Sequence, residues 1–152
     1  MAEKIRAVLV QNSQSAYAIA LQLELRAQAV EIQASESCRD IHALMAAPNP
    51  PELVMTDLRL SDGTWEDVVR ISQSASLPVN VIVISRLAEV RLYMEVLQGG
   101  AFDFITPPFL AAELSHVLRT AFGNASKKRE ALTRHSVPRG ANEILPLLAL
   151  AG

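Results

Sequence analysis

The first candidate for chemistry is Asp57, a carboxylate at the end of the short apolar run Leu53-Val54-Met55. A short apolar run between prolines and a turn-rich segment is typical of a strand buried on both faces of a parallel sheet. In open α/β sheets, ligands bind at the carboxyl ends of the strands. A carboxylate there is either a functional group or a cap for the following turn, because Asp is also favoured in turns.

Other segments that follow predicted strands are expected at the same edge of the sheet. They are Gln11 with Asn12, Ser85, and the rigid turn Thr106-Pro107-Pro108. Amide and hydroxyl groups near a carboxylate can bind a polar ligand through hydrogen bonds. Asn12 is also a favoured N-cap for the next helix, as is Ser13.

The elements that position these residues alternate along the chain. Apolar and β-branched runs predict strands over 5–10, 29–34, 52–57, 79–84 and 102–105. The segments between them predict helices over 15–27, from 35 or 37 to before 48, from 64 to before 78, over 88–98 and from about 110. Five such alternations predict a doubly wound α/β fold, in which helices cover both faces of a five-stranded parallel sheet.

Helical spacing also predicts which side chains face the sheet. In the fourth helix we expect Val90, Met94 and Leu97 on the inner face. In the fifth helix the expected apolar stripe is Leu114, Val117, Leu118, Ala121 and Phe122. The pattern weakens after Gly123, where the helix is expected to continue to about Thr133 and to break over 136–140. We therefore predict a domain over 1–123 and a helix extension with a tail or linker over 124–152.

Composition is that of a globular chain. Of its 152 residues, 50% are hydrophobic and 20% are charged, so it can bury a core. The single cysteine, Cys38, excludes an internal disulfide and a cysteine metal cluster. The apolar run Ala7 to Val10 is too short for a signal peptide, and no run approaches the roughly 18 residues of a membrane span, so we expect a cytoplasmic protein.

Charge is unevenly distributed along the chain. Residues 1–122 hold nine Lys/Arg and fourteen Asp/Glu, a net charge of −5, and residues 123–152 hold five and two, a net charge of +3. Aromatic residues and a recognition-helix pattern do not accompany the basic tail, so nucleic-acid binding is not expected.

The arrangement around Asp57 resembles the receiver domain of two-component response regulators, over roughly residues 4–122. The resemblance depends on Asp57 itself, the loop Ser61-Asp62-Gly63, the hydroxyl of Ser85 and the stretch 99–109, which is similar to the family's signature before helix five. It implies a flavodoxin-like fold with strand order 2-1-3-4-5. It also makes the peptide bonds before Pro107 and Pro108 candidates for the cis form, because the family has one before the proline that Pro108 matches.

The resemblance further implies that a histidine kinase or a small phosphodonor phosphorylates Asp57. Such chemistry uses Mg²⁺ held by an acidic pair after strand one, a lysine after strand five, and a hydroxyl that binds the phosphoryl group. Ser85 matches this phosphoryl-sensing hydroxyl, and Phe104 matches the family's aromatic switch position, where we expect a packed ring.

Two parts of this pattern are missing from the sequence. Neutral Gln11 and Asn12 stand at the acidic pair, and Pro107 stands at the lysine. Loss of these charges removes much of the electrostatic stabilisation of phosphoryl transfer. We therefore expect an atypical receiver, not an enzyme, in which phosphorylation at Asp57 is weakened or lost. No cofactor is expected. If phosphorylation is retained, Mg²⁺ would be held by Asp57, Asn12 and the backbone of Arg59.

One alternative retains phosphorylation: Arg59 or Arg86 supplies the missing positive charge, although a position in solvent is the favoured expectation for each side chain. In both cases the expected partners are a histidine kinase or another signalling protein. A homodimer through the fourth helix, fifth strand and fifth helix is also expected. Leu92, Tyr93 and Val96 are either part of that surface or complete the edge of the core.

Two enzyme hypotheses have weaker support. Asp62-Gly63-Thr64 is similar to a motif of haloacid-dehalogenase-type phosphatases, but Leu60 stands where their nucleophile lies. A flavodoxin-like FMN protein would use the loop Asn12-Ser13-Gln14-Ser15, which lacks glycine and is better explained as a helix cap. His42, His116 and His135 are isolated and are expected on the surface.

Overall fold

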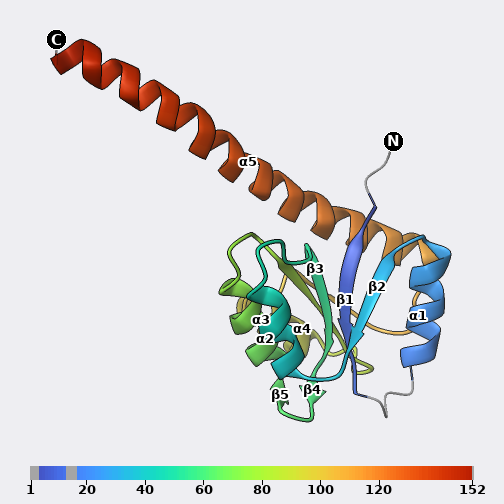
Figure 1. Cartoon of the computed structure of the whole chain (residues 1–152). Helices are drawn as coiled ribbons and strands as arrows, with labels where there is room; N and C mark the ends of the chain where they lie inside the picture. Colours follow the sequence, from blue (N-terminus) through green and yellow to red (C-terminus); the bar gives the residue numbers. More distant parts are fainter. Residues whose placement is uncertain (1–3, 13–16, 152) are drawn as a thin grey trace.

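The chain folds around a single parallel sheet. A computed structural model of the protein describes residues 4–12 and 17–151, with side chains through Arg134. The sheet has the order β2-β1-β3-β6-β7, which confirms the predicted order 2-1-3-4-5, since β6 and β7 are its fourth and fifth strands (Figure 1). The strands are β1 (Arg6–Val10), β2 (Glu31–Ser35), β3 (Leu53–Asp57), β6 (Asn80–Ile84) and β7 (Asp103–Ile105).

Helices cover both faces of this sheet, and each face has its own apolar core. One core lies against α1 (Ala18–Ala27) and α5 (Ala111–Ala151). The other lies against α2 (Cys38–Met45), α3 (Trp65–Gln73) and α4 (Val90–Gln98). Alternate residues of the central strands enter opposite cores, so these strands are apolar on both faces, which explains their continuous hydrophobic runs in the sequence.

A small hairpin replaces the loop predicted after β3. β4 (Arg59–Leu60) pairs antiparallel with β5 (Gly63–Thr64) across the turn residues Ser61 and Asp62. Gly63 permits a close approach here, because a Cβ on it would lie 2.6 Å from Asp67 Oδ2 and 2.8 Å from Cys38 Sγ. The hairpin thus brings the segment after Asp57 against the starts of α2 and α3.

The predicted inner face of α4 was wrong for Val90 and Met94, and Leu97 is half-buried. Val90 and Met94 are 75% and 52% exposed, whereas Val96 is fully buried. The reason is Gly99 at the end of α4, where a Cβ would lie 2.5 Å from the Trp65 ring. This close packing holds the end of α4 against Trp65, and Val96 faces the core.

The apolar stripe predicted for α5 is confirmed. Leu114, Leu118 and Ala121 are buried, and Val117 and Phe122 pack against the same core. The helix extends well past the expected end at Thr133, and the expected break over 136–140 is not found, because α5 continues to Ala151. A proline removes only one backbone donor, so helical hydrogen bonds can resume on either side of it.

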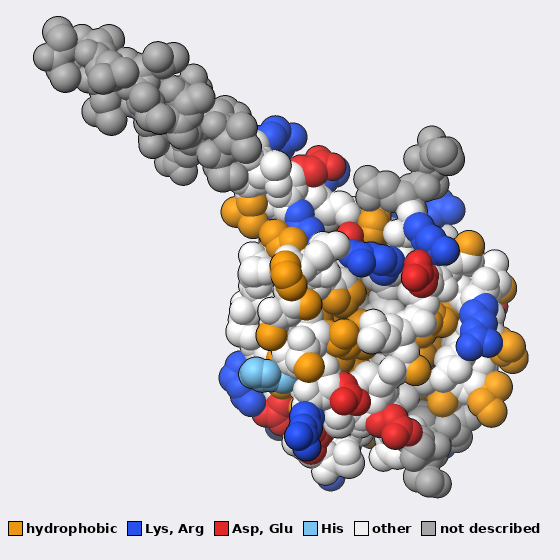
Figure 2. Space-filling view, in the orientation of Figure 1, with side chains coloured by type: hydrophobic (Ala, Val, Ile, Leu, Met, Phe, Trp, Pro, Cys, Tyr) orange, Lys and Arg blue, Asp and Glu red, His pale blue; other side chains and the backbone are white. Residues whose placement is uncertain are grey.

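The surface carries charges of both signs. Figure 2 shows hydrophobic side chains scattered among acidic and basic ones over the face that it presents. Within the described residues, no helix is both long enough and apolar enough to cross a bilayer.

Candidate functional site

Asp57 is the last residue of β3, and its side chain is held by two neutral donors. The backbone N–H of Asn12 donates to Oδ2 over 2.7 Å, and the hydroxyl of Tyr17 donates to Oδ1. Asp57 is only 5% exposed. Burial raises its pKa above the ordinary value, because a carboxylate loses solvation there, while the bonds from Tyr17 and Asn12 favour the charged form and act in the opposite direction.

A pocket of about 290 Å³ opens beside this carboxylate. The end of β3, the end of β6 and the segments that follow them form its walls. Its lining residues are Asn12, Tyr17, Asp57, Leu58, Arg59, Ile84, Ser85, Arg86 and Leu87. The structure therefore brings Asp57, Asn12 and Ser85 together as predicted, and it adds both arginines of the alternative hypothesis.

Neither arginine is engaged with the carboxylate. Arg59 and Arg86 are exposed, and among the described residues the ion pairs do not include one between either side chain and Asp57. The pocket thus has two exposed arginines in its lining and neutral hydrogen-bond donors at the Asp57 carboxylate.

Gln11 lies outside this pocket. Its side chain is buried, and its Oε1 accepts a hydrogen bond from Gln22 Nε2 of α1 over 3.5 Å. Its backbone N–H donates to the Ser35 carbonyl oxygen at the end of β2 over 3.0 Å. Gln11 therefore lies between β1, β2 and α1, whereas Asn12 is the residue of the pair that reaches Asp57.

The remaining predicted site residues have structural partners. Ser85 Oγ accepts the backbone N–H of Leu87 over 2.9 Å, so it shapes the turn after β6. The Phe104 ring packs edge-to-face on Tyr93 with centroids 6.0 Å apart, as expected of a packed ring. Pro107 is half-buried, and the Pro107–Pro108 bond is cis, as the resemblance implied.

Asp62, which the phosphatase hypothesis used, has a structural role in the hairpin. Its Oδ1 accepts the backbone N–H of Cys38 over 2.8 Å and its Oδ2 accepts that of Arg39 over 3.0 Å. The first turn of a helix favours a negative charge, and these bonds lower the pKa of Asp62. The FMN hypothesis depends on the loop 12–15, most of which lies outside the described residues. In the part of the chain that the structure describes, no group of three or more His, Cys, Asp or Glu is arranged to hold a metal ion.

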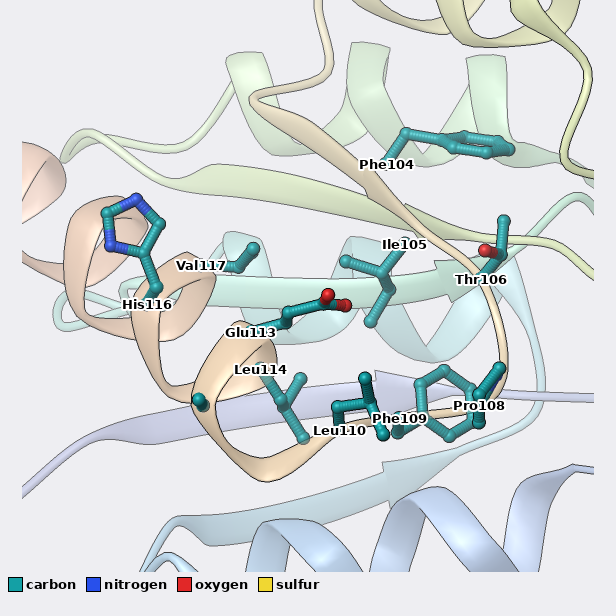
Figure 3. Close-up of a pocket in the computed structure, with 11 residues that line it drawn as sticks. Phe104, Ile105, Thr106, Pro108, Phe109, Leu110, Glu113, Leu114, His116 and Val117 are labelled. Atoms are coloured by element: carbon teal, nitrogen blue, oxygen red, sulfur yellow. The ribbon is translucent and has the colours of Figure 1, made fainter.

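A second pocket of about 500 Å³ lies between β7 and the start of α5 (Figure 3). Phe104, Pro108 and Phe109 form much of its apolar lining, and Glu113 extends from α5 toward Ile105. It shares no lining residue with the Asp57 pocket, but Phe109 touches Tyr17, with ring centroids 5.8 Å apart.

Tyr17 is the site residue that sequence reasoning missed. It lies just before α1 and reaches Asp57 across 40 positions of the chain. The signal available in the sequence was its place: it is a lone aromatic residue at the start of the helix that follows strand one, near the edge where the strands end.

Known proteins support this description of the fold. No family model matches the chain. The response regulator PilR of Pseudomonas aeruginosa is 28% identical over 101 residues, which are 66% of this chain and 22% of PilR. The Escherichia coli regulator KdpE is 37% identical over 79 residues, 51% of this chain and 34% of KdpE. The chain thus spans about a third or less of these two relatives.

Solved structures of single domains match over nearly their full length. The signal receiver domain of a LuxO-type repressor from Vibrio parahaemolyticus has a TM-score of 0.69 and 25% identity, covering 86% of this chain and 98% of that domain. This chain has the fold of a response-regulator receiver domain. The receiver domain of the sensor histidine kinase PA1611 from Pseudomonas aeruginosa, solved with magnesium in its active-site cleft, shares the fold at 18% identity, with a TM-score of 0.67 over 80% of this chain and 99% of that domain.

Proposed function

We propose that this receiver domain works in two-component signalling through protein–protein contacts, with phosphorylation at Asp57 weakened or lost. The observation that carries the proposal is that Asp57 is the single acidic residue among the described residues lining its pocket. Neutral Asn12 stands beside it, and Pro107 occupies the position at which the family resemblance implies a lysine.

The residues around Asp57 do not fit Mg²⁺. This ion requires oxygen ligands in near-octahedral geometry and is usually bound through carboxylates. Here both carboxylate oxygens accept bonds from donors, Asn12 N–H and the Tyr17 hydroxyl, and Gln11 is directed to Gln22. A metal would have to displace these donors and bind beside a single negative charge, so the proposed function does not depend on one.

The alternative function is a phosphoacceptor that uses an arginine as its cation. One observation favours it: Arg59 and Arg86 both line the Asp57 pocket. A guanidinium group can bind phosphoryl oxygens through two parallel hydrogen bonds. However, both side chains are exposed, and neither forms an ion pair with Asp57 among the described residues, so each would have to move inward.

Incubation with acetyl phosphate and Mg²⁺, followed by intact-mass measurement, tests the proposal. We expect no stoichiometric addition of a phosphoryl group to the wild type, as for the control Asp57→Asn. A stable adduct that Asp57→Asn abolishes would contradict the proposal. If Arg59→Gln with Arg86→Gln also abolishes that adduct while the fold is retained, the arginine alternative is correct.

The contact surface we propose includes the outer face of α4. Val90, Tyr93 and Met94 are exposed there, and Leu87 is exposed in the segment before the helix. They replace most of the predicted set, since Val96 is buried and Leu92 packs against the core. Arg91 and Glu95 form an ion pair 3.7 Å apart on the same helix, so α4 presents both charges, which a self-complementary two-fold contact can pair across the interface. We propose a second copy as its partner, through α4, β7 and α5, and a histidine kinase or another signalling protein as the upstream partner.

A further inference from the structure

Tyr17 is fixed at three points around the Asp57 pocket. Its hydroxyl donates to Asp57 Oδ1 and lies 3.4 Å from the carbonyl oxygen of Ile84, the last residue of β6. Its ring packs edge-to-face against Phe109, with an interplanar angle of 69°. Phe109 follows the cis Pro107–Pro108 bond in the turn between β7 and α5. One side chain from the start of α1 therefore touches the ends of β3 and β6 and the turn after β7.

This arrangement gives Asp57 a hydrogen-bond donor without a positive charge. The family resemblance implies that the turn after the fifth strand supplies a lysine to the carboxylate. In this chain that turn supplies Phe109, which supports the Tyr17 ring, and the phenol supplies the donor. A phenol hydroxyl is an uncharged donor, so it stabilises the carboxylate without adding the positive charge that a lysine would offer to a phosphoryl group.

We propose that Tyr17 closes access to the carboxylate oxygens of Asp57 within this pocket, as a positioning residue. While its hydroxyl binds Oδ1 and Asn12 binds Oδ2, both carboxylate oxygens are engaged, and a reagent reaches them only after Tyr17 moves away. This inference rests on the proposed function, because it treats Asp57 as a carboxylate held by neutral donors and not by a metal ion.

Movement of Tyr17 also alters a second surface. Phe109 lines the 500 Å³ pocket between β7 and α5, and loss of the Tyr17 ring removes the support on its other side. Opening at Asp57 is thereby coupled to the shape of the face that we propose as a contact surface. The connection runs through one ring pair, so a single substitution can break it.

Carbodiimide coupling of carboxyl groups to glycinamide, read by peptide mass spectrometry, tests this closure. In the folded wild type we expect exposed Asp62 and Glu66 to be labelled while Asp57 resists. In Tyr17→Ala, labelling of Asp57 should rise by about tenfold or more, the size expected for losing a hydrogen bond to a charged group. The matched control is Tyr93→Ala, which removes a similar edge-to-face pair with Phe104 away from Asp57 and should leave its labelling unchanged.

Labelling of wild-type Asp57 as fast as Asp62, or an unchanged rate in folded Tyr17→Ala, would overturn the inference. If Tyr17→Ala does not fold, Tyr17→Phe is the test variant, because it keeps the ring and removes only the hydroxyl. Its Asp57 pKa, followed by carboxyl ¹³C NMR, should rise because a bond to the charged form is lost. An unchanged pKa would contradict the inference. The labelling needs neither Mg²⁺ nor a phosphodonor, so its result is separate from the acetyl phosphate test of the proposed function.

Discussion

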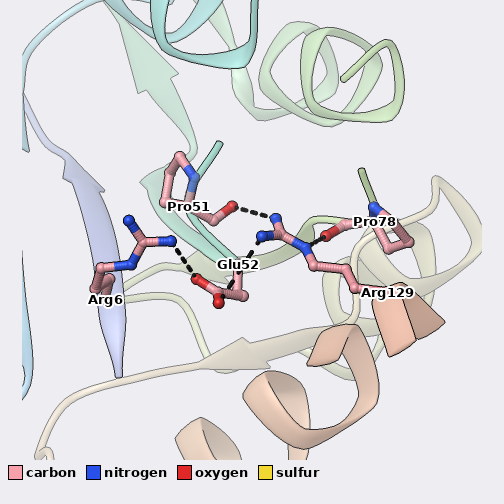
Figure 4. A network of polar contacts seen from close by, with 5 residues as sticks. All are labelled: Arg6, Pro51, Glu52, Pro78 and Arg129. Carbon is pink, nitrogen blue, oxygen red and sulfur yellow. Dashed lines mark hydrogen bonds and ion pairs between the residues drawn. The ribbon is translucent and has the colours of Figure 1, made fainter. Parts of the chain in front are cut away.

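Arg129 of α5 and Glu52, the residue before β3, form an ion pair at the end of the sheet away from Asp57, with Nη1 and Oε2 3.8 Å apart (Figure 4). The same guanidinium donates to the carbonyl oxygens of Pro78 over 2.8 Å and Pro51 over 3.1 Å. Arg6 donates to the other side of Glu52 over 3.1 Å. These contacts fasten α5 beyond its apolar stripe, at the starts of β3 and β6.

Removal of this guanidinium should destabilise the domain. Arg129→Ala leaves two carbonyl oxygens without their donor, so we expect a loss of about 2 kcal/mol in the free energy of unfolding. Arg129→Lys should lose a smaller amount, because an ammonium keeps the charge but lacks the planar fork that reaches both carbonyls. Urea denaturation measures both.

The neighbouring Lys128→Ala is the control for this effect. Its side chain is exposed, so its substitution should change stability by less than about 0.5 kcal/mol. Equal effects of Arg129→Ala and Lys128→Ala would show that the contacts in Figure 4 do not fasten the helix.

The buried carboxylate of Asp57 should make stability depend on pH. Its pKa is raised above the ordinary value of 3.8, so between these two values the folded state binds more protons than the unfolded chain. Stability contributed by Asp57 is therefore lost as the pH rises through the folded pKa, and the loss persists at neutral pH. Urea unfolding of the wild type and Asp57→Asn from acid to neutral pH measures this difference. If the free energy of unfolding of the wild type instead rose relative to that of Asp57→Asn as the pH rises, this result would contradict the raised pKa of Asp57.

The exposed face of α4 should control self-association if a second copy binds there. Val90→Glu with Met94→Glu places charges on two exposed apolar positions. Full burial of such a side chain contributes about 1.5 to 3 kcal/mol, so the dimer dissociation constant should rise by at least about tenfold. Ile19→Glu with Leu23→Glu makes the same change on the exposed face of α1 and should have no effect. Analytical ultracentrifugation reads the outcome, and a wild type that remains monomeric would contradict the homodimer.

The sheet and the α5 stripe could be predicted because local pattern determines them. Continuous apolar runs report strands buried on both faces, and Leu114, Leu118 and Ala121 repeat at helical spacing. The α4 face could not, because its rotation depends on a glycine: Gly99 packs on Trp65 and brings Val96 inward. A prediction based on the spacing of apolar side chains takes no account of glycine, because glycine has no side chain.

Some residues of the candidate site could likewise be predicted from the sequence, and others could not. Asp57, Asn12 and Ser85 could be placed together because each follows a strand of one parallel sheet. Tyr17 could not, since its contact with Asp57 joins residues 40 positions apart and leaves no periodic trace in the sequence. The direction of the Gln11 side chain could not be predicted either, because its contact with Gln22 depends on how α1 packs.

Magnesium binding tests the central claim most directly, namely that Asp57 lacks the charged partners of a phosphoacceptor. The backbone amide signals of Asn12, Asp57 and Ser85 are followed by ¹⁵N NMR while Mg²⁺ is added to millimolar concentration. Asn12→Asp, which places a second carboxylate beside Asp57, serves as the comparison and should gain a saturable response. We predict no saturable shift at these three amides in the wild type. A saturable shift in the wild type, lost in Asp57→Asn, would contradict the account.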